Sequence, residues 1–164
     1  MSKINKIILG LDPGFADTGW GVIEKNTSII RYLNTGSIQT SKKLDFSKRL
    51  QIIYKEVNSL IKKYNPDIVA VEKLYFAKNV KTALDVGQAR GVVLLAIAQN
   101  KKEVWEFTPL QVKQTVCANG QANKTQVGLM VKTILKLKAV PKPDDAADAL
   151  AVAITASFFN KELA

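Results

Sequence analysis

Residues 6–12 of the chain are Lys-Ile-Ile-Leu-Gly-Leu-Asp, an apolar run that ends in an acid and is followed at once by Pro13 and Gly14. An almost uninterrupted apolar run of this length is typical of a strand that is buried on both faces of a sheet. Residues 20–24 and 29–39 have the composition of two further strands. Because the connections are short, we expect the three strands to form an antiparallel meander.

The apolar pattern changes its period after residue 40. Apolar side chains from Phe46 to Tyr64 recur every three or four residues, which predicts an amphipathic helix that ends before Pro66. A strand over residues 67–72, a helix over 79–99 and a strand over 103–107 are expected next. This alternation implies right-handed crossovers between parallel strands.

Three helices are expected to complete the chain. Thr108 is the predicted N-cap of the first, which begins with Pro109 and stops at Gly120. Asn123 is the predicted N-cap of the second, which two prolines, at positions 141 and 143, would end, and the last covers about residues 144–159. The predicted fold is α/β, with antiparallel strands 1–3 and parallel strands 4–5 in one five-stranded mixed sheet and helices on both faces.

The charge balance of the chain points toward a polyanionic partner without requiring one. Among 164 residues, 24 Lys and Arg stand against 14 Asp and Glu, which gives a net charge of +10. A dense positive surface gains affinity for phosphates by releasing their counterions, but it also keeps a protein in solution. The length predicts a single domain over residues 1–164.

Several classes of protein are excluded by residues that the chain lacks. Cys117 is the only cysteine and there is no histidine, so a disulfide scaffold, a Cys/His zinc site and a Ser-His-Asp triad are all impossible. The longest apolar stretch, residues 92–98, is too short to span a bilayer. The first residues lack the apolar centre of a signal peptide. We therefore expect a cytoplasmic protein with no membrane partner, whose chemistry would use carboxylates, lysines, hydroxyls or a bound metal.

Four carboxylates occupy positions where core residues would be expected. Asp12 and Glu72 each end a buried strand, whereas Asp145 and Asp148 are three residues apart on one face of an alanine-rich helix. Turn chemistry explains Asp12, and a helix N-terminus explains the other aspartates singly, with Asp144 as the N-cap. No such rule places Glu72. Strands one and four can be neighbours in a mixed sheet, which would gather these acids at one edge.

A shared cation would account for the four acids together. Hard oxygen ligands without histidine favour Mg²⁺ or Mn²⁺ over zinc. Two such ions about 4 Å apart can activate a water and stabilise the leaving oxygen during phosphodiester hydrolysis. An acidic metal pocket within a basic protein therefore indicates a nuclease.

Five blocks of the sequence, in order, resemble the RuvC family of Holliday junction resolvases. They cover residues 8–22, 71–79, 87–92, 111–116 and 145–155. A lone Asp-Pro-Gly would be weak evidence, but the five blocks together span nearly the whole chain. The resemblance implies a ribonuclease H-like fold, a homodimer, and Mg²⁺-dependent nicking of four-way DNA junctions in recombination and repair. The nicks would be paired and symmetric, with 5′-phosphate and 3′-hydroxyl ends.

The resemblance also assigns catalytic residues. The family's catalytic, metal-binding acids fall on Asp12, Glu72, Asp145 and Asp148, which would hold up to two Mg²⁺ ions per subunit, with Mn²⁺ as a possible substitute. The Asp144-Asp145 doublet leaves an ambiguity of one residue. We choose Asp145 because it stands three residues before Asp148, as in the family's motif.

Other residues that match the family suggest contacts with DNA. Lys113 and Lys124 match basic residues near the scissile phosphate or its backbone, and Lys113 is assigned a catalytic role as well. Without the resemblance, both would be interpreted as solvated helix lysines. Tyr75 and Phe76 precede Lys78 in a basic loop, where aromatic rings could stack on opened bases or wedge between them. The resemblance gives the stacking role to Tyr75.

Small residues at a spacing of four suggest a close helix contact. Ala83, Gly87 and Gly91 share one face of the helix expected over residues 79–99. They could pack against the chain's own sheet or against the same helix of a second copy, and a two-fold dimer would suit a two-fold junction. The family also implies branch-migration helicase machinery as a partner.

Two alternative functions stay open from the residues alone. One is a different ribonuclease H-like nuclease that cuts an RNA:DNA hybrid or a replication fork. The other is an architectural protein that binds junctions without cutting them. Such a protein would keep the positive charge but would have no use for Glu72 and the Asp145/Asp148 pair.

Overall fold

The sheet has the predicted strands in a mixed order. The computed structural model of the chain describes residues 5–74 and 80–159. Its strands are β1 (Lys6–Asp12), β2 (Asp17–Lys25), β3 (Ile30–Gln39), β4 (Ile68–Glu72) and β5 (Glu103–Phe107), arranged as β3-β2-β1-β4-β5. Strands β1 to β3 pair antiparallel, and β4 pairs parallel with both β1 and β5. The meander, the mixed sheet and the adjacency of strands one and four are thereby confirmed.

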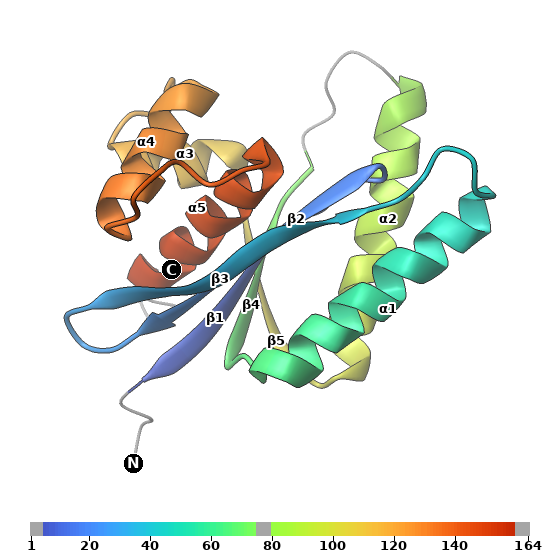
Figure 1. Cartoon of the computed structure of the whole chain (residues 1–164), viewed down its shortest axis with the longest axis horizontal. Coiled ribbons are helices and arrows are strands. Elements are labelled where there is room, and N and C mark those ends of the chain that lie inside the picture. The colour runs from blue at the N-terminus through green and yellow to red at the C-terminus, as the bar shows by residue number, and fades with distance from the viewer. Residues whose placement is uncertain (1–4, 75–79, 160–164) are drawn as a thin grey trace.

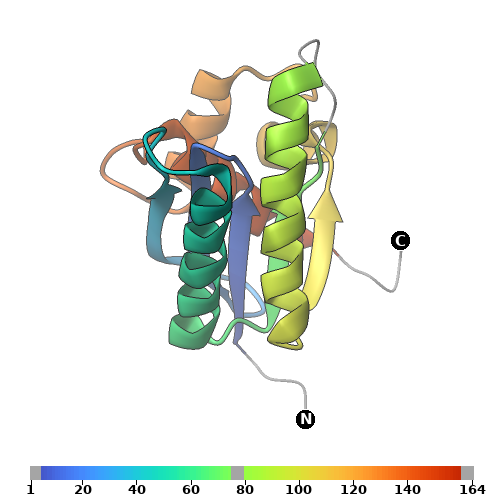
Figure 2. The ribbon, with the colours of Figure 1, turned by 90° about the vertical axis from the view of Figure 1, so that its right-hand side faces the viewer.

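Helices cover both faces of this sheet, as predicted (Figure 1). One face carries α1 (Phe46–Tyr64) and α2 (Val80–Gln99), which lie side by side in Figure 2. The other face carries α3 (Pro109–Cys117), α4 (Lys124–Ile134) and α5 (Asp144–Phe158). None of the described helices combines the length and the apolarity needed to cross a lipid bilayer.

Strand alternation directs the two strand-end acids toward the same layer of helices. Successive side chains of a strand point to opposite faces of the sheet. In β1, Leu9 and Leu11 pack in the core with α1 and α2, whereas Ile8 packs in the core with α3 to α5. In β4, Ile68 and Ala70 likewise belong to the core with α3 to α5. By the same alternation, Asp12 and Glu72 lie on the α5 side of the sheet.

Two of the predicted helix starts are confirmed in atomic detail. The backbone N–H of Gln111 donates to Thr108 Oγ1 over 3.1 Å, and the Thr108 N–H donates to Gln111 Oε1 over 2.8 Å. Asn123 and Gln126 form the same reciprocal pair at the start of α4. Both are capping boxes, which satisfy amide groups that a helix N-terminus leaves without partners.

Three predicted boundary features are wrong. Helix α3 ends at Cys117 and not at Gly120, because Ala118 is left-handed (φ 53°) and a turn held by Asn119 follows. Helix α4 ends at Ile134, before either proline, and Lys136 is left-handed as well. Asp144 is the first helical residue of α5 and not its N-cap, since Pro143 takes that place and the Asp144 carboxylate pairs with Lys142 at 3.0 Å.

Helix α5 packs backbone to backbone against β1 and β2. A Cβ atom on Gly10 would lie 2.1 Å from the carbonyl oxygen of Ala149, and one on Gly19 would lie 1.9 Å from that of Asp145. Real Cβ atoms do not approach other atoms so closely. Glycine on the strands and alanine on the helix therefore let α5 settle onto the sheet, with its first turn beside the end of β1.

We predict that Gly10→Ala lowers the free energy of unfolding by about 2 kcal/mol or more, because the new methyl group would force α5 away from β1. Chemical denaturation measures this directly. Gly120→Ala is the control, since its Cβ would meet only the side-chain ends of exposed Leu110 and Gln114, which can move aside. Equal stability of the Gly10 variant and the control would show that α5 is not seated as described.

Candidate metal centre

Asp12 and Glu72 meet at the carboxyl-terminal edge of the sheet. Leu11 of β1 lies opposite Val71 of β4 in the parallel register, so the next residues of the two strands are neighbours. The two carboxyl groups lie close enough for each to shift the pKa of the other. Burial, followed by the nearby charges of Glu72 and Asp148, raises the pKa of Asp12 well above its usual value. Burial also raises the pKa of Glu72. Two ionised carboxylates are therefore costly here without a compensating cation.

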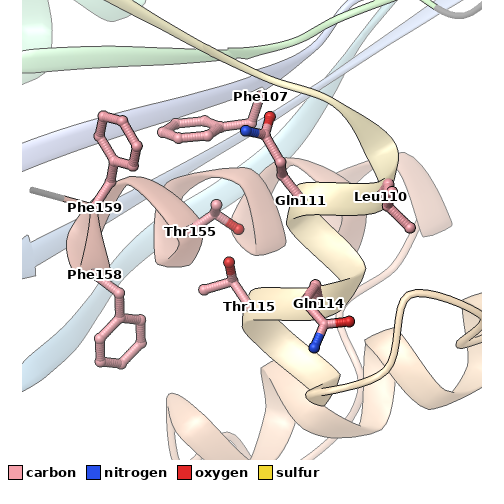
Figure 3. Close-up of a pocket in the computed structure, with 8 residues that line it drawn as sticks. All are labelled: Phe107, Leu110, Gln111, Gln114, Thr115, Thr155, Phe158 and Phe159. Atoms are coloured by element: carbon pink, nitrogen blue, oxygen red, sulfur yellow. The ribbon is translucent and has the colours of Figure 1, made fainter. Parts of the chain in front are cut away.

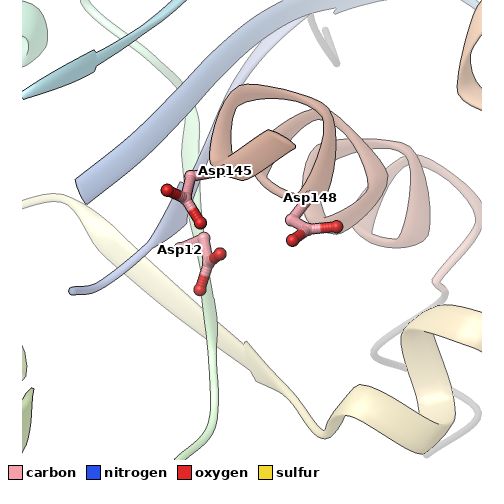
Figure 4. A group of neighbouring side chains, drawn as sticks. All are labelled: Asp12, Asp145 and Asp148. Atoms are coloured by element: carbon pink, nitrogen blue, oxygen red, sulfur yellow. The ribbon is translucent and has the colours of Figure 1, made fainter. Parts of the chain in front are cut away.

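The first turns of α5 bring two further acids to this edge. Ligand oxygens of Asp12, Asp145 and Asp148 all lie within 4.8 Å of one another (Figure 4). Burial, followed by the charge of Asp17, raises the pKa of Asp145. Asp144 does not belong to this group, because it is exposed and its carboxylate pairs with Lys142. The choice of Asp145 over Asp144 thus agrees with the geometry of the cluster.

A cavity of about 360 Å³ opens in front of the acids, and we call it the acidic cavity. Its walls include Asp12, Glu72 and Asp148 together with Lys113 and Lys124. The amine of Lys124 lies 3.0 Å from Asp148 Oδ2, and this contact raises the pKa of Lys124. The structure therefore brings three of the four predicted acids and two of the predicted lysines to a single cavity, and the fourth acid, Asp145, lies beside Asp12 and Asp148.

The donor set fits a hard divalent cation. Three carboxylates present oxygen atoms close enough to share one ion, and Glu72 adds a fourth beside Asp12. Oxygen donors of this kind are the preferred ligands of Mg²⁺ and Mn²⁺. The two lysines offset part of the negative charge, and a bound cation would offset the rest. The cluster is accordingly an arrangement of side chains that could hold a divalent metal ion.

The loop that follows Asp12 is held by contacts that sequence reasoning missed. The Thr18 hydroxyl donates to the carbonyl of Gly14 over 2.6 Å. The carbonyl of Phe15 accepts from the Thr40 hydroxyl at 2.6 Å and from the guanidinium of Arg49 at 3.3 Å. Arg49 is buried and lies over the Phe15 ring, 3.7 Å from its centroid. A buried cation in this place fixes the backbone immediately after Asp12.

Two other side chains near the acids were also missed. Asp17 Oδ1 is buried and has no hydrogen-bond partner among the described residues. Strand alternation from Gly19 could have placed Asp17 on the α5 side, where its charge acts on Asp145. Arg90 of α2 donates from Nε to the backbone carbonyl of Glu72 over 3.5 Å and pairs with Glu106. Nothing in the spacing of Arg90 signals this contact, which depends on how α2 packs.

A larger cavity, of about 380 Å³, lies between α3 and the carboxyl-terminal end of α5 (Figure 3). Its walls are mainly apolar and include Phe107, Leu110, Phe158 and Phe159, with no acidic or basic side chain. Without a group to activate water or hold a cation, this cavity is not the candidate site.

Three of the predicted DNA-binding residues are not among those placed at the acidic cavity. Tyr75, Phe76 and Lys78 lie outside the residues that the structure describes. Their assigned contacts with DNA stay predictions.

Comparison with known proteins gives concordant matches over most of the chain. The family model described as "Crossover junction endodeoxyribonuclease RuvC" matches residues 8–156. A protein of that description from Halothermothrix orenii is 55% identical over 148 residues, which are 90% of this chain and 90% of that protein. One from Clostridioides difficile is 52% identical over 155 residues, covering 94% of this chain and 92% of that protein.

Solved structures agree with these matches. Thermus thermophilus RuvC is 36% identical, with a TM-score of 0.83 over 93% of this chain and 94% of that one. The structure titled "T. thermophilus RuvC in complex with Holliday junction substrate" is 36% identical, with a TM-score of 0.87 over 93% of each chain. The yeast mitochondrial Holliday junction resolvase, at 16% identity and a TM-score of 0.68, shares the fold. The ribonuclease H-like fold expected from the sequence is confirmed.

We predict that Asp12→Asn stabilises the metal-free protein near pH 7 by about 1 kcal/mol, because it removes a buried charge that its neighbours repel. The raised pKa means that the folded protein keeps this proton to higher pH than the unfolded chain. Wild-type stability in EDTA should therefore fall as pH rises through the interval between the two pKa values, and the variant should fall less.

Denaturation in EDTA and in Mg²⁺ across pH measures both effects. Wild type should gain stability from Mg²⁺, by about 2.7 kcal/mol at a concentration one hundred times the dissociation constant, and the variant should lose most of that gain. A variant that is less stable than wild type in EDTA at pH 7, with an unchanged response to Mg²⁺, would contradict this account.

Proposed function

The chain belongs to the RuvC family of crossover junction endodeoxyribonucleases, and on that premise we propose that it resolves four-way DNA junctions by paired symmetric nicks. The observation that carries the proposal is the acidic cavity, which joins the carboxylates of Asp12, Glu72 and Asp148 to two lysines at one edge of the sheet. We infer that one nuclease domain, acting in the cytoplasm, performs the reaction on junctions that arise in recombination and repair.

We propose Mg²⁺ as the cofactor, held by Asp12, Asp145 and Asp148 with Glu72 beside Asp12. When bound, up to two ions would supply the acidity that activates a water and the positive charge that stabilises the departing 3′ oxygen. The in-line attack on phosphorus would leave a 5′-phosphate and a 3′-hydroxyl.

The chain's own residues would orient the reacting groups. Lys113 lies at the wall of the cavity, where its amine can hold a non-bridging oxygen of the scissile phosphate. Arg49 holds the loop that follows Asp12 through the carbonyl of Phe15, which would limit movement of the Asp12 backbone. Arg90 holds the end of β4 through the carbonyl of Glu72. A rigid set of carboxylates matters because small displacements of a catalytic group cost large factors in rate.

The net charge of +10 favours binding to a crossover, where several phosphate backbones converge. Tyr75, Phe76 and Lys78 are proposed to contact the opened bases there, and Lys113 and Lys124 the strand that is cut. A branch-migration helicase as partner stays a prediction from family membership.

We propose that α2 forms the contact of a two-fold dimer. Leu84 and Leu95 on this helix are 63% and 52% exposed, and a Cβ on Gly87 or Gly91 would meet no atom within 4 Å. The two glycines therefore do not pack against the described part of the chain's own sheet. A second copy of α2 could approach this face closely, and a two-fold axis there would pair two complete sites with the two strands of a junction.

We expect the purified protein with Mg²⁺ to nick a synthetic four-way junction at paired, symmetric positions and to leave linear duplex intact. Ca²⁺ should support binding without cutting, and Asp12→Asn should bind but not cut, because its basic surface is unchanged. Gel electrophoresis of end-labelled strands measures the products. Cutting of an RNA:DNA hybrid in place of the junction, or tight binding without cutting in any metal, would each overturn the proposal.

We expect Leu84→Arg to convert the dimer into a monomer, because the charge would be buried at the helix contact. Light scattering measures the mass, and the junction assay should show single nicks in place of paired ones. Leu110→Arg is the matched control, since Leu110 is 62% exposed on α3, away from α2. A Leu84 variant with unchanged mass would place the dimer contact elsewhere.

A further inference from the structure

A third cavity lies directly beside the acidic cavity, and we call it the adjacent cavity. Its volume is about 350 Å³, and it opens between α4 and the segment that leads into α5. Lys124 and Asp148 line both cavities. The adjacent cavity therefore begins where the proposed catalytic site ends, although nothing in the proposed reaction uses it.

The wall between the two cavities includes an ion pair. Lys124 Nζ lies 3.0 Å from Asp148 Oδ2, and the Lys124 side chain is 71% exposed. If Asp148 serves as a cation ligand, the attraction that holds Lys124 there is weakened. The amine is then free to turn toward a phosphate while it stays between the two cavities. A strand whose scissile phosphate sits over the acids would continue past this point.

The lining of the adjacent cavity combines an apolar surface with two lysine–aspartate pairs. Gly128, Leu129, Val140 and Ala147 supply the apolar surface, and the missing side chain of Gly128 lets Val140 pack directly against the α4 backbone. Sugar rings and the faces of bases pack well against such groups. The volume is within the range of sites that hold small organic molecules of nucleotide size.

A second lysine stands at this cavity with a partner that is easily replaced. Lys142 Nζ lies 3.0 Å from Asp144 Oδ1, and both side chains are mostly exposed. Exposed ion pairs of this kind contribute little stability. A phosphate oxygen, which also forms charge-assisted hydrogen bonds, can therefore compete with the Asp144 carboxylate for the Lys142 amine. Asp144, which is outside the metal cluster, thus lines this cavity beside Lys142.

We propose that the adjacent cavity binds the nucleotide next to the scissile phosphate on the strand that is cut. Its sugar and base would lie against the apolar surface, and Lys142 would hold its phosphate. This inference rests on the proposed function and deepens it, since a pocket that encloses one flanking nucleotide would make the cutting rate depend on the base at that position.

Two variants and two controls test the proposal. Thr125 is exposed and lines the cavity, so Thr125→Trp should fill it, and Lys142→Gln removes the proposed phosphate contact. Thr133→Trp places the same ring on an exposed position of α4 that does not line the cavity, and Lys138→Gln removes an exposed lysine of the same segment. All four are compared with wild type for thermal unfolding and for Mn²⁺ affinity of the free protein, which should not change.

The direct measurement is the fluorescence of 2-aminopurine placed at each position flanking the scissile phosphate of a junction, with the protein bound in Ca²⁺. Wild type and both controls should change the signal at one flanking position, and Thr125→Trp should not. In Mg²⁺, single-turnover cutting by Thr125→Trp and Lys142→Gln should fall about 10-fold or more. The order of preference among bases at that position should also change for the tryptophan variant.

The subsite would be overturned if Thr125→Trp gave the wild-type fluorescence change at the flanking position and both variants cut the junction at the wild-type rate. The proposed function would then stay intact. A wild-type protein that cuts no junction would overturn the proposed function, and the fluorescence in Ca²⁺ would still decide whether a flanking nucleotide enters the cavity.

Discussion

The approach of α5 to the strand backbones brings two acids of the site, Asp145 and Asp148, beside Asp12. Gly10 and Gly19 leave no room for a side chain beneath the helix, so the first turn of α5 comes to rest beside the end of β1. The parallel pairing of β1 with β4 independently sets Glu72 next to Asp12. Two backbone contacts, one between strands and one between helix and sheet, therefore converge on a group of carboxylates that repel one another. Close packing supplies the free energy that holds them together.

The price of this arrangement is electrostatic, and the surrounding residues lower it only in part. Burial raises the pKa of Asp12, Glu72 and Asp145, which means that each ionised form is disfavoured in the folded protein. Lys124 forms an ion pair with Asp148, and the positive charge of Lys113 partly offsets the negative charge of Glu72. The N-terminal end of α5 adds a favourable dipole. A site that remains electrostatically unsatisfied without a cation is one whose metal binding and folding stability are linked.

The fold and the four acids could be predicted because their signals are local. The apolar run before Asp12, the acid that ends β4 and the spacing of Asp145 and Asp148 are all visible in short windows of sequence. The rest depends on contacts between distant segments. Asp17 acts on Asp145 across more than one hundred residues, and Arg49 reaches Phe15 only after α1 has packed on the sheet. The ends of α3 and α4 were mispredicted since left-handed Ala118 and Lys136 carry no sequence mark comparable to glycine.

Helix α2 connects the proposed site to the proposed dimer. Arg90, on one side of the helix, contacts the backbone of Glu72, while Gly87 and Gly91, on another, leave open space. Every acid comes from one chain, so a second copy would add no catalytic group and would serve only to set the distance and direction between two sites. Because α2 contacts the metal site and would also form the dimer contact, it would fix the distance between the two sites directly. The two cuts of a two-fold junction would then be placed by the same rigid element that orients Glu72.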